Sequence, residues 1–390
     1  MKKTLILTIM FFIFVVTNAF AGGFEFYGVG IKATSMGFNF TGVADNPTAM
    51  FWNPAGLTQL DTEKFTLTGE TQFVYSDVYV EHSGGTDNTN TLTVIPEIFI
   101  GRSFGKWAAA LGIYAPHAVG SFSYENITSP SANMGGLPVT DFDATVAMPA
   151  IGGSLAVEVT PQLSIGITAE LFYSMLEMEM TTPMGKFKIE DDGFSGGRAS
   201  IGMLYEAMPG LRLGANVKLP ATLRFDGTQM AFGVKTNHRG IVELPWILFL
   251  GGSYQLTPDF LVSAQYILSL YGETDSYLPD PNNPQSVYDN IQCMGLGFEW
   301  KASPVLDLRG GLAYQTNGQK PENWSMLSLA NAEGEAFFFN AGFSYWLTSD
   351  LSFDFVGTWI HYPDTDSKLY PDETYGGNAY NTMIGITYKF

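Results

Sequence analysis

The side chains best suited to metal binding or catalysis are sparse in this chain. It has four histidines, His82, His117, His238 and His361, and a single cysteine, Cys293. The histidines do not have the spacing of a metal site, and no serine lies in a nucleophile elbow or a recognisable Ser-His-Asp triad. We therefore predict that the protein is not an enzyme, with no catalytic residues, no metal site and no cofactor.

Two acidic segments carry the oxygen ligands that calcium prefers, Asp191-Asp192-Gly193 and Asp280-Pro281-Asn282-Asn283. The same residue types are common in solvated turns, which is the interpretation we favour. Cys293 is either a reactive thiol or a buried or lipid-facing side chain, and we favour the second. A lone cysteine allows no internal disulfide, so the fold itself must provide the stability.

Residues 42–57 hold the densest cluster of local structure signals. Asp45-Asn46-Pro47 has the composition of a turn, and Asn53-Pro54-Ala55-Gly56 that of a helix start. Asparagine caps a helix well, and proline at the first helical position loses no hydrogen bond. The apolar run between them ends in Phe51 and Trp52. We expect two short helices joined by a tight reversal.

The first 21 residues have the pattern of a secretory signal peptide. Lys2 and Lys3 precede an apolar run over Leu5–Val16, and Ala19-Phe20-Ala21 has the form of a cleavage site. The formal charge of −19 argues against nucleic acid as a partner and against docking to anionic lipid. We expect an exported protein without a transmembrane helix in its mature part.

The rest of the chain alternates short turns with longer polar loops. Six short turns, each followed by an alternating strand, begin near Phe104, Thr160, Met208, Thr257, Ser303 and Thr348. The polar loops expected between them are 81–90, 125–138, 181–193, 226–239, 272–286, 317–334 and 363–378. This alternation is typical of an outer-membrane barrel, with turns on the periplasmic side and loops outside. A soluble propeller could show a similar period, but its strands are shorter and come four to a repeat.

Counting the segments predicts 14 antiparallel strands over residues 62–390. In Leu163–Tyr173 every second residue is apolar and would face lipid, and the aromatic content of 14% suits membrane girdles. A lumen of this width is a water-filled hole unless something plugs it. We therefore expect residues 22–61 to form a small helical hatch inside an all-β transmembrane barrel.

At this point the chain resembles a known family, the FadL/TodX outer-membrane transporters of hydrophobic compounds. The resemblance rests on Asn53-Pro54-Ala55-Gly56-Leu57, Ile95-Pro96-Glu97, Glu243-Leu244-Pro245, Leu308–Tyr314 and the closing Phe390. It extends over nearly all of the mature chain. The resemblance implies an N-terminal hatch, an apolar pocket, and a kinked third strand that opens the wall sideways.

By that resemblance, the hatch and gating residues are Asp45, Asn46, Pro47, Asn53, Pro54, Ala55 and Gly56. The third strand would be Trp107–Tyr124, and its lateral opening would involve Gly112, Pro116, His117 and Gly120. An ordinary bulge without an opening is the alternative. For the lumen ligand site we select Phe51, Trp52, Met175, Met178 and Met180, because methionine suits a promiscuous apolar site. Simple packing that fills the lumen is the other interpretation of the methionines.

Two departures from the family pattern bear on the cargo. The third and fourth outer loops are short, and the methionine run stands where we would look for a basic residue facing a ligand carboxylate. The remaining basic candidates are Arg198, Arg212, Lys218, Arg224 and Arg309.

We expect passive uptake of a hydrophobic small molecule, a long-chain fatty acid or an aromatic or aliphatic hydrocarbon, with lateral exit at the third strand. A general diffusion porin is the alternative, disfavoured by the low content of charged residues, and an adhesin would need longer loops. The expected partners are the ligand, outer-membrane lipid and, during biogenesis, the barrel-assembly machinery. We expect a monomer in the bacterial outer membrane.

Overall fold

The computed structural model describes residues 28–134, 137–274, 288–318, 320 and 334–390. The predicted signal peptide lies outside these residues. Helices are few and short: α2 (Ile31–Ser35), α3 (Ala49–Trp52), and the 3₁₀ helices η1 (Pro54–Gln59) and η2 (Tyr271–Glu273). Among the described residues, no helix is long and apolar enough to cross a bilayer.

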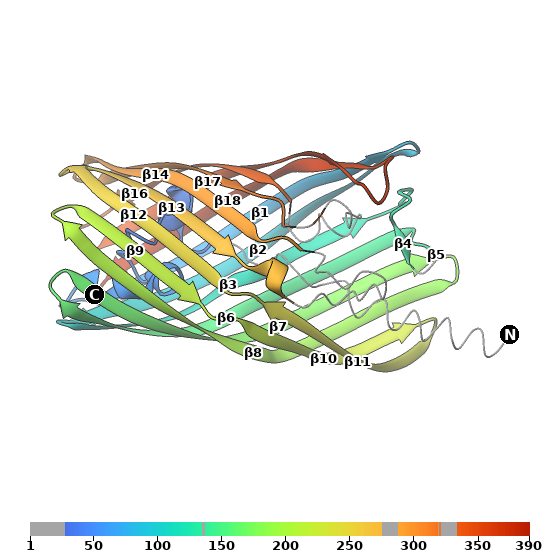
Figure 1. Ribbon diagram of the computed structural model, residues 1–390, viewed down its shortest axis with the longest axis horizontal. Coiled ribbons are helices and arrows are strands. Elements are labelled where there is room, and N and C mark those ends of the chain that lie inside the picture. The colour runs from blue at the N-terminus through green and yellow to red at the C-terminus, as the bar shows by residue number, and fades with distance from the viewer. Residues whose placement is uncertain (1–27, 135–136, 275–287, 319, 321–333) are drawn as a thin grey trace.

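Strands form most of the molecule (Figure 1). Sixteen of them join in one sheet: β1 (Thr66–His82), β2 (Gly85–Phe104), β3 (Trp107–Tyr124), β6 (Asp141–Thr160), β7 (Leu163–Thr182), β8 (Gly185–Met208), β9 (Leu211–Lys218), β10 (Ala221–Ala231), β11 (Val234–Leu244), β12 (Ile247–Thr257), β13 (Phe260–Ser269), β14 (Ile291–Ser303), β15 (Leu306–Gln315), β16 (Ala336–Trp346), β17 (Leu351–Asp366) and β18 (Thr374–Lys389). A separate small sheet pairs β4 (Asn133–Met134) with β5 (Leu137–Pro138).

The sheet closes into a barrel of 14 strand positions. β1 pairs with β18 along its length, and β8 pairs with β9 through one half and with β10 through the other. β9 and β10 are therefore two halves of the seventh strand, and β11 and β12 are two halves of the eighth. The halves separate at Leu219-Pro220 and Pro245-Trp246, because proline cannot donate a hydrogen bond to a ladder. The prediction of a 14-stranded antiparallel barrel is confirmed.

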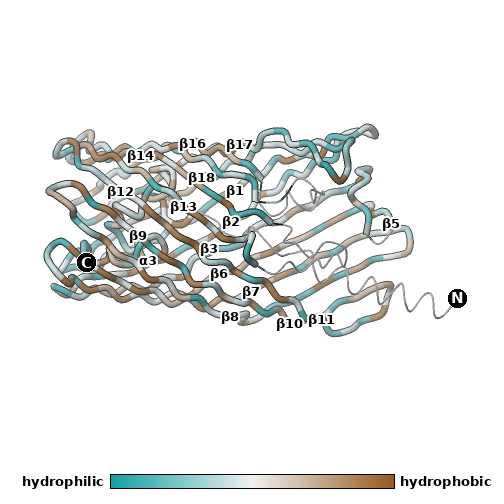
Figure 2. Tube along the Cα trace, in the orientation of Figure 1, coloured by the Kyte–Doolittle hydropathy of each residue, from teal (hydrophilic) through white to brown (hydrophobic). Residues whose placement is uncertain are grey.

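The outer face of the barrel is apolar between two rows of aromatic residues, and Figure 2 shows apolar residues along the body of the strands. In this band Leu155, Ile167, Leu171 and Ile201 each expose more than half of their surface. The exposed aromatic residues near the short turns include Phe104, Trp107, Tyr205, Trp300 and Phe390. Those toward the other end include Tyr75, Phe194, Trp246, Trp359 and Tyr380. Such girdles mark the two membrane interfaces of a barrel.

Three of the predicted outer loops are wrong, because their residues extend the strands. The stretches 81–90, 181–193 and 226–239 are hairpins with two-residue turns, between β1 and β2, β7 and β8, and β10 and β11. Beyond the lipid band the outward-facing residues meet water, so charged and apolar side chains alternate there. Such a strand has the overall polarity of a loop, which is why composition alone mistakes it for one.

The N-terminal segment, residues 28–61, lies inside the barrel toward the end that holds the C-terminus (Figure 1). Nearly all of its side chains are buried, and its apolar residues form one cluster with inward-facing residues of the wall such as Phe99, Tyr114 and Phe249. A second buried apolar cluster lines the other end of the barrel interior and includes Phe142, Met178 and Phe225. The N-terminal segment therefore fills one end of the interior, and apolar side chains of the wall line the other end.

Candidate functional site

Asn53 joins the N-terminal segment to the wall. It ends α3 in an extended conformation, with a φ angle of −165°, and its side-chain oxygen accepts a hydrogen bond from the Ala55 N–H at 3.2 Å. Its side-chain nitrogen donates to the carbonyl oxygens of Thr41 and of Met203 in β8, both at 2.9 Å. Pro54 follows as the first residue of η1, so the predicted helix start is confirmed.

Two glycines of the wall let this junction lie directly against the barrel. A Cβ on Gly202 of β8 would overlap Asn53 Oδ1, and a Cβ on Gly166 of β7 would lie 2.5 Å from the carbonyl carbon of Pro54. Real Cβ atoms essentially never come within 3.0 Å of another heavy atom, so any other residue at either position would displace the segment. Ala55 and Gly56 are buried in the same interface.

Wall side chains bind the irregular backbone that precedes Asn53. The Gln265 side chain of β13 accepts hydrogen bonds from the backbone N–H groups of Phe40 (3.1 Å) and Thr41 (2.7 Å) and donates to the Phe38 carbonyl (2.6 Å). The Thr168 hydroxyl of β7 donates to the Met50 carbonyl at 2.7 Å. These bonds satisfy buried backbone groups that neither a helix nor a sheet would otherwise pair.

Phe51 and Trp52, which we selected as ligand residues, are buried in an aromatic cluster. Their rings meet edge to face, and each also lies edge-on to Phe249 of β12, with centroids 6.2 Å and 6.1 Å away. Phe51 also contacts Tyr114 of β3, and the Lys218 ammonium lies 3.2 Å from the Phe51 ring centroid. In this arrangement both rings contact the wall rather than an open lumen.

Charged residues hold the opposite side of the segment. Lys32 Nζ in α2 lies 2.8 Å from the Asp45 carboxylate and 2.9 Å from that of Glu299 in β14, which also pairs with Arg309 of β15 at 2.6 Å. Burial alone would lower the pKa of the Lys32 ammonium, but Asp45 and Glu299 outweigh it and hold that pKa above its ordinary value. A polar cavity of about 300 Å³ adjoins this network. Asp45 thus binds the stretch that contains Asn46 and Pro47 to Lys32 of α2.

The third strand has the predicted bounds, Trp107–Tyr124, and leaves β2 part-way along its length. β2 and β3 pair from Phe104–Trp107 as far as Ile98–Ile113, and beyond that no ladder pair joins them within the described chain. Gly112 is therefore the last but one residue of β3 that pairs with β2. We call the unpaired stretch, residues 90–97 of β2 and 114–122 of β3, the β2–β3 gap.

Pro116, His117 and Gly120 lie along this gap, where the pairing of β3 with β6 also shifts register around His117. Glu97 of β2 lies at the end of the gap next to the last ladder pair. Its carboxylate accepts hydrogen bonds from the backbone N–H groups of Ala115 in β3 and Gly30 in the N-terminal segment, both at 3.4 Å. At the far rim the Ser123 N–H donates to the Thr89 hydroxyl at 3.1 Å. The gap is thus closed at both ends and adjoins the buried segment.

The three selected methionines of β7 do not share a face. Met178 and Met180 are buried in the second apolar cluster, which lines the end of the interior away from the N-terminal segment. Met175 is 42% exposed on the outer face, which removes it from the lumen site. The reason is the strand period of two, because an offset of three residues reverses the side chain's direction.

Arg198 of β8 is buried, with 4% of its surface exposed. It donates to the carbonyl oxygens of Leu219 (2.9 Å) and Pro245 (3.0 Å), the residues at the two strand breaks. A third nitrogen lies 3.3 Å from His117 Nε2, beside the β2–β3 gap. Of the other basic residues considered, Arg224 points outward, whereas Lys218 and Arg309 are buried in the interior. Within the described chain, no three His, Cys, Asp or Glu side chains are grouped to hold a metal ion.

A family model decides the assignment. The model described as "Outer membrane protein transport protein (OMPP1/FadL/TodX)" matches residues 12–382. The chain belongs to the FadL/TodX family. It is accordingly an outer-membrane transport protein with a β-barrel fold. None of the curated proteins matches it.

Solved FadL/TodX structures share the fold at low sequence identity. A Pseudomonas aeruginosa FadL homologue superposes with a TM-score of 0.75 at 12% identity, covering 95% of this chain and 99% of that one. The Pseudomonas putida toluene transporter TodX gives 0.73 at 16% identity, covering 93% and 99%. The Ralstonia pickettii toluene transporter TbuX gives 0.70 at 17% identity, again covering 93% and 99%.

Several residues of this FadL/TodX site were missed by sequence reasoning. Lys32, Glu97, Gln265 and Glu299 lie far apart in the chain, and only barrel closure brings them to the N-terminal segment. A usable signal existed for three of them, since a charged or amide side chain on the lumen face of a strand requires a partner. Their partners, mostly backbone groups of an irregular segment, leave no trace in a sequence pattern.

Proposed function

We propose that this protein takes up uncharged hydrophobic small molecules passively and releases them sideways through the β2–β3 gap. The observation that carries the proposal is the end of pairing at Ile98–Ile113, directly beside the segment that fills the bore. A molecule that enters the interior from the end lined by the second apolar cluster meets this segment before it can cross the barrel. The gap offers it a different way out.

The surroundings of the gap suit a release into lipid. The outward-facing residues that border it, Val94, Ile98 and Ile113, are each about half exposed and apolar. This part of the gap therefore faces the hydrocarbon band rather than water. An apolar molecule gains free energy by moving into lipid, so diffusion down its gradient needs no energy source.

The buried cations favour uncharged cargo over fatty acids. Lys32 and Arg309 both pair with Glu299, and Arg198 donates to two backbone carbonyls. Lys218 lies over the Phe51 ring. A carboxylate in this interior would compete with these partners for a cation or be buried without one, which is costly. Relatives described as toluene transporters and as a monoaromatic hydrocarbon channel lend support to the same class of cargo.

The test is uptake by cells that express the protein from a plasmid, compared with cells that carry the empty plasmid. Radiolabelled toluene should enter faster with the protein, and benzoate, which differs mainly by its charge, should not. The double variant Pro116→Val/Gly120→Val restores strand-forming residues at the gap and should reduce toluene uptake at least fivefold. Pro363→Val, which replaces a proline beside a register shift in β17, is the matched control and should transport normally. Unchanged uptake by a folded double variant would exclude exit through the gap.

A further inference from the structure

The seventh and eighth strands break side by side. The last pair between β9 and β12 is Lys218–Ile247, and the first between β10 and β11 is Ala221–Leu244. Prolines stand at both interruptions, and Arg198 binds the carbonyls of Leu219 and Pro245 from inside. The double break is thus stabilised by a specific buried side chain.

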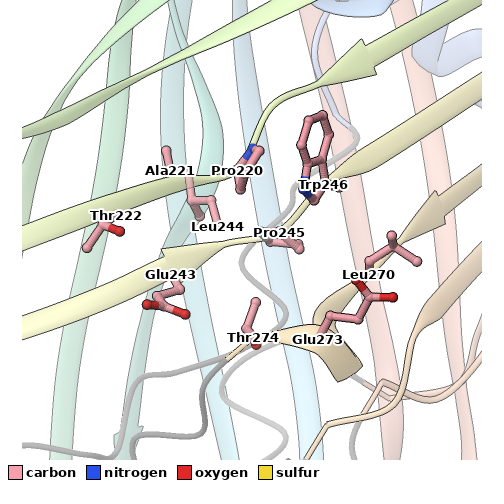
Figure 3. A pocket seen from close by; sticks show the side chains of 10 residues that line it. All are labelled: Pro220, Ala221, Thr222, Glu243, Leu244, Pro245, Trp246, Leu270, Glu273 and Thr274. Carbon is pink, nitrogen blue, oxygen red and sulfur yellow. The ribbon is translucent and has the colours of Figure 1, made fainter.

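Among the described residues, ladder pairing on one side of the eighth strand ends at this break. β12 pairs with β13 up to Ile247–Ser269, whereas β11 has a ladder partner only in β10 among the described residues. The chain after β13 turns away into η2. A cavity of about 360 Å³ lies between this edge of β11 and η2 (Figure 3). We call it the β11 wall cavity.

The β11 wall cavity is lined from both faces of the barrel. Leu244 belongs to the buried apolar cluster of the interior, and Ala221 packs against that cluster. Trp246, by contrast, is 45% exposed on the outer face. The lining therefore combines residues of the inner and the outer face, which places the cavity within the wall at the strand break.

The cavity lies at the outer edge of the lipid-facing band. On the β9 and β12 side of the break the outward-facing residues are apolar, as Leu213 and Leu250 show. On the β10 and β11 side, Asp226 and Arg239 form an ion pair whose side chains are 72% and 86% exposed. Trp246 stands at the change, as interfacial tryptophans do. The end of the β2–β3 gap nearest the last ladder pair differs, because Val94, Ile98 and Ile113 there are apolar.

We propose that the β11 wall cavity is a second opening through the barrel, through which uncharged apolar molecules pass from the outer membrane surface into the lumen. The inference rests on the proposed transport function and adds a binding site and a direction to it. Molecules dissolved in the interface would enter at β11, and the β2–β3 gap would return them to hydrocarbon.

The chemistry of the lining selects the occupant. Glu243 and Glu273 bring two carboxylates to the cavity, and no described residue that lines it is basic (Figure 3). An anionic molecule such as a carboxylate or a lipid phosphate would be repelled by these side chains. Pro220, Leu270 and Trp246 supply apolar surface. A cavity of this volume is at the small end of the range for ligand sites, roughly 300–1,000 Å³, which suits a single aromatic ring.

Binding is tested on the purified full-length protein in detergent. A polarity-sensitive fluorophore is attached to Thr222→Cys in a Cys293→Ala background, and toluene and benzoate are titrated separately. Toluene should change the emission saturably, and benzoate should not at the same concentration. In Glu243→Gln/Glu273→Gln the apparent affinity for benzoate should rise about tenfold. The same label at Asp226→Cys, on the exposed face of the hairpin, is the control and should show no saturable change. An equal response at both labels would overturn the site.

Passage is tested by filling the cavity. Ala221→Trp should lower the initial rate of toluene uptake at least fivefold, whereas Thr228→Trp, farther along β10, should not. Heat-modifiable mobility on gels checks that both variants fold. If Ala221→Trp does not fold, Ala221→Leu replaces it, and an unchanged rate in the folded variant overturns the proposal. Failure of the wild type to take up toluene would refute the transport function, while the titration of the purified protein would still decide the site.

Discussion

The ammonium group of Lys32 lies 2.9 Å from the carboxylate of Glu299, which ties a helix inside the barrel to a strand of its wall. Arg309 of β15 lies 2.6 Å from the same carboxylate, so Glu299 is shared between the N-terminal segment and the barrel wall. On the other side of the segment, Asn53 bonds to Met203 of β8. The N-terminal segment is thus held to the wall at two sides by polar bonds of single side chains.

Removing the shared carboxylate should loosen the segment. Glu299→Gln leaves Lys32 and Arg309 without their common anion, and breaking a buried pair in this way costs about 3–5 kcal/mol. We expect the conductance of the protein in planar bilayers to rise from a low level to frequent openings. Glu179→Gln removes the partner of the exposed Lys186, a pair that solvent screens, and should leave conductance unchanged. A quiet Glu299→Gln channel would contradict the role of this network.

Two substitutions of Asn53 separate its roles as cap and as anchor. Asn53→Asp keeps an oxygen that accepts from Ala55 but loses the donors to Thr41 and Met203, whereas Asn53→Ala loses all three bonds. Loss of a helix N-cap costs about 0.5–2 kcal/mol. Hydrogen exchange of residues 49–59 should therefore accelerate in both variants, and more in Asn53→Ala. Equal protection in Asn53→Ala and the wild type would contradict the anchor.

The strands that face lipid were predictable, and β3 has the predicted bounds. In these segments every second residue must be apolar, so the sequence period reports the structure directly. The hairpin at 181–193, for example, was mistaken for a loop because its outward residues, such as Lys186 and Glu190, meet water. Its inward residues, Phe187 and Ile189, carried the missed signal, since they alternate with these charges.

The candidate site was predictable only in part. The Asn53-Pro54 junction follows from local rules of capping, and its helix start is observed. Long-range relationships were not accessible, because Lys32 and Glu299 are 267 positions apart and nothing between them indicates that they meet. The double break was missed as well, although prolines near the middle of two neighbouring strands, Pro220 and Pro245, were a visible warning.

The close contact between the N-terminal segment and the wall predicts that Gly202 does not tolerate substitution. A methyl group on Gly202 would collide with Asn53 and Pro54, whereas a methyl group on Gly69 of β1 would meet nothing within 4 Å. Gly202→Ala should therefore displace the segment, expose it to added protease and increase bilayer conductance. Gly69→Ala should resemble the wild type in both measurements. Identical protease patterns for the two variants would refute the close fit.

The opposite faces of one strand allow a direct test of the interior ligand surface. Met178 is buried in the apolar lining of the interior, and Met175, three residues away on β7, is 42% exposed on the outside. Met178→Gln places an amide in the path of an apolar molecule, which loses contact area and must share the space with a hydrated group. The KM for toluene uptake should rise severalfold, with little change in the amount of folded protein. Met175→Gln makes the same chemical change outside the lumen and should leave the KM at the wild-type value. An equal effect of both substitutions, or of neither, would show that the methionine face of β7 does not contact the cargo.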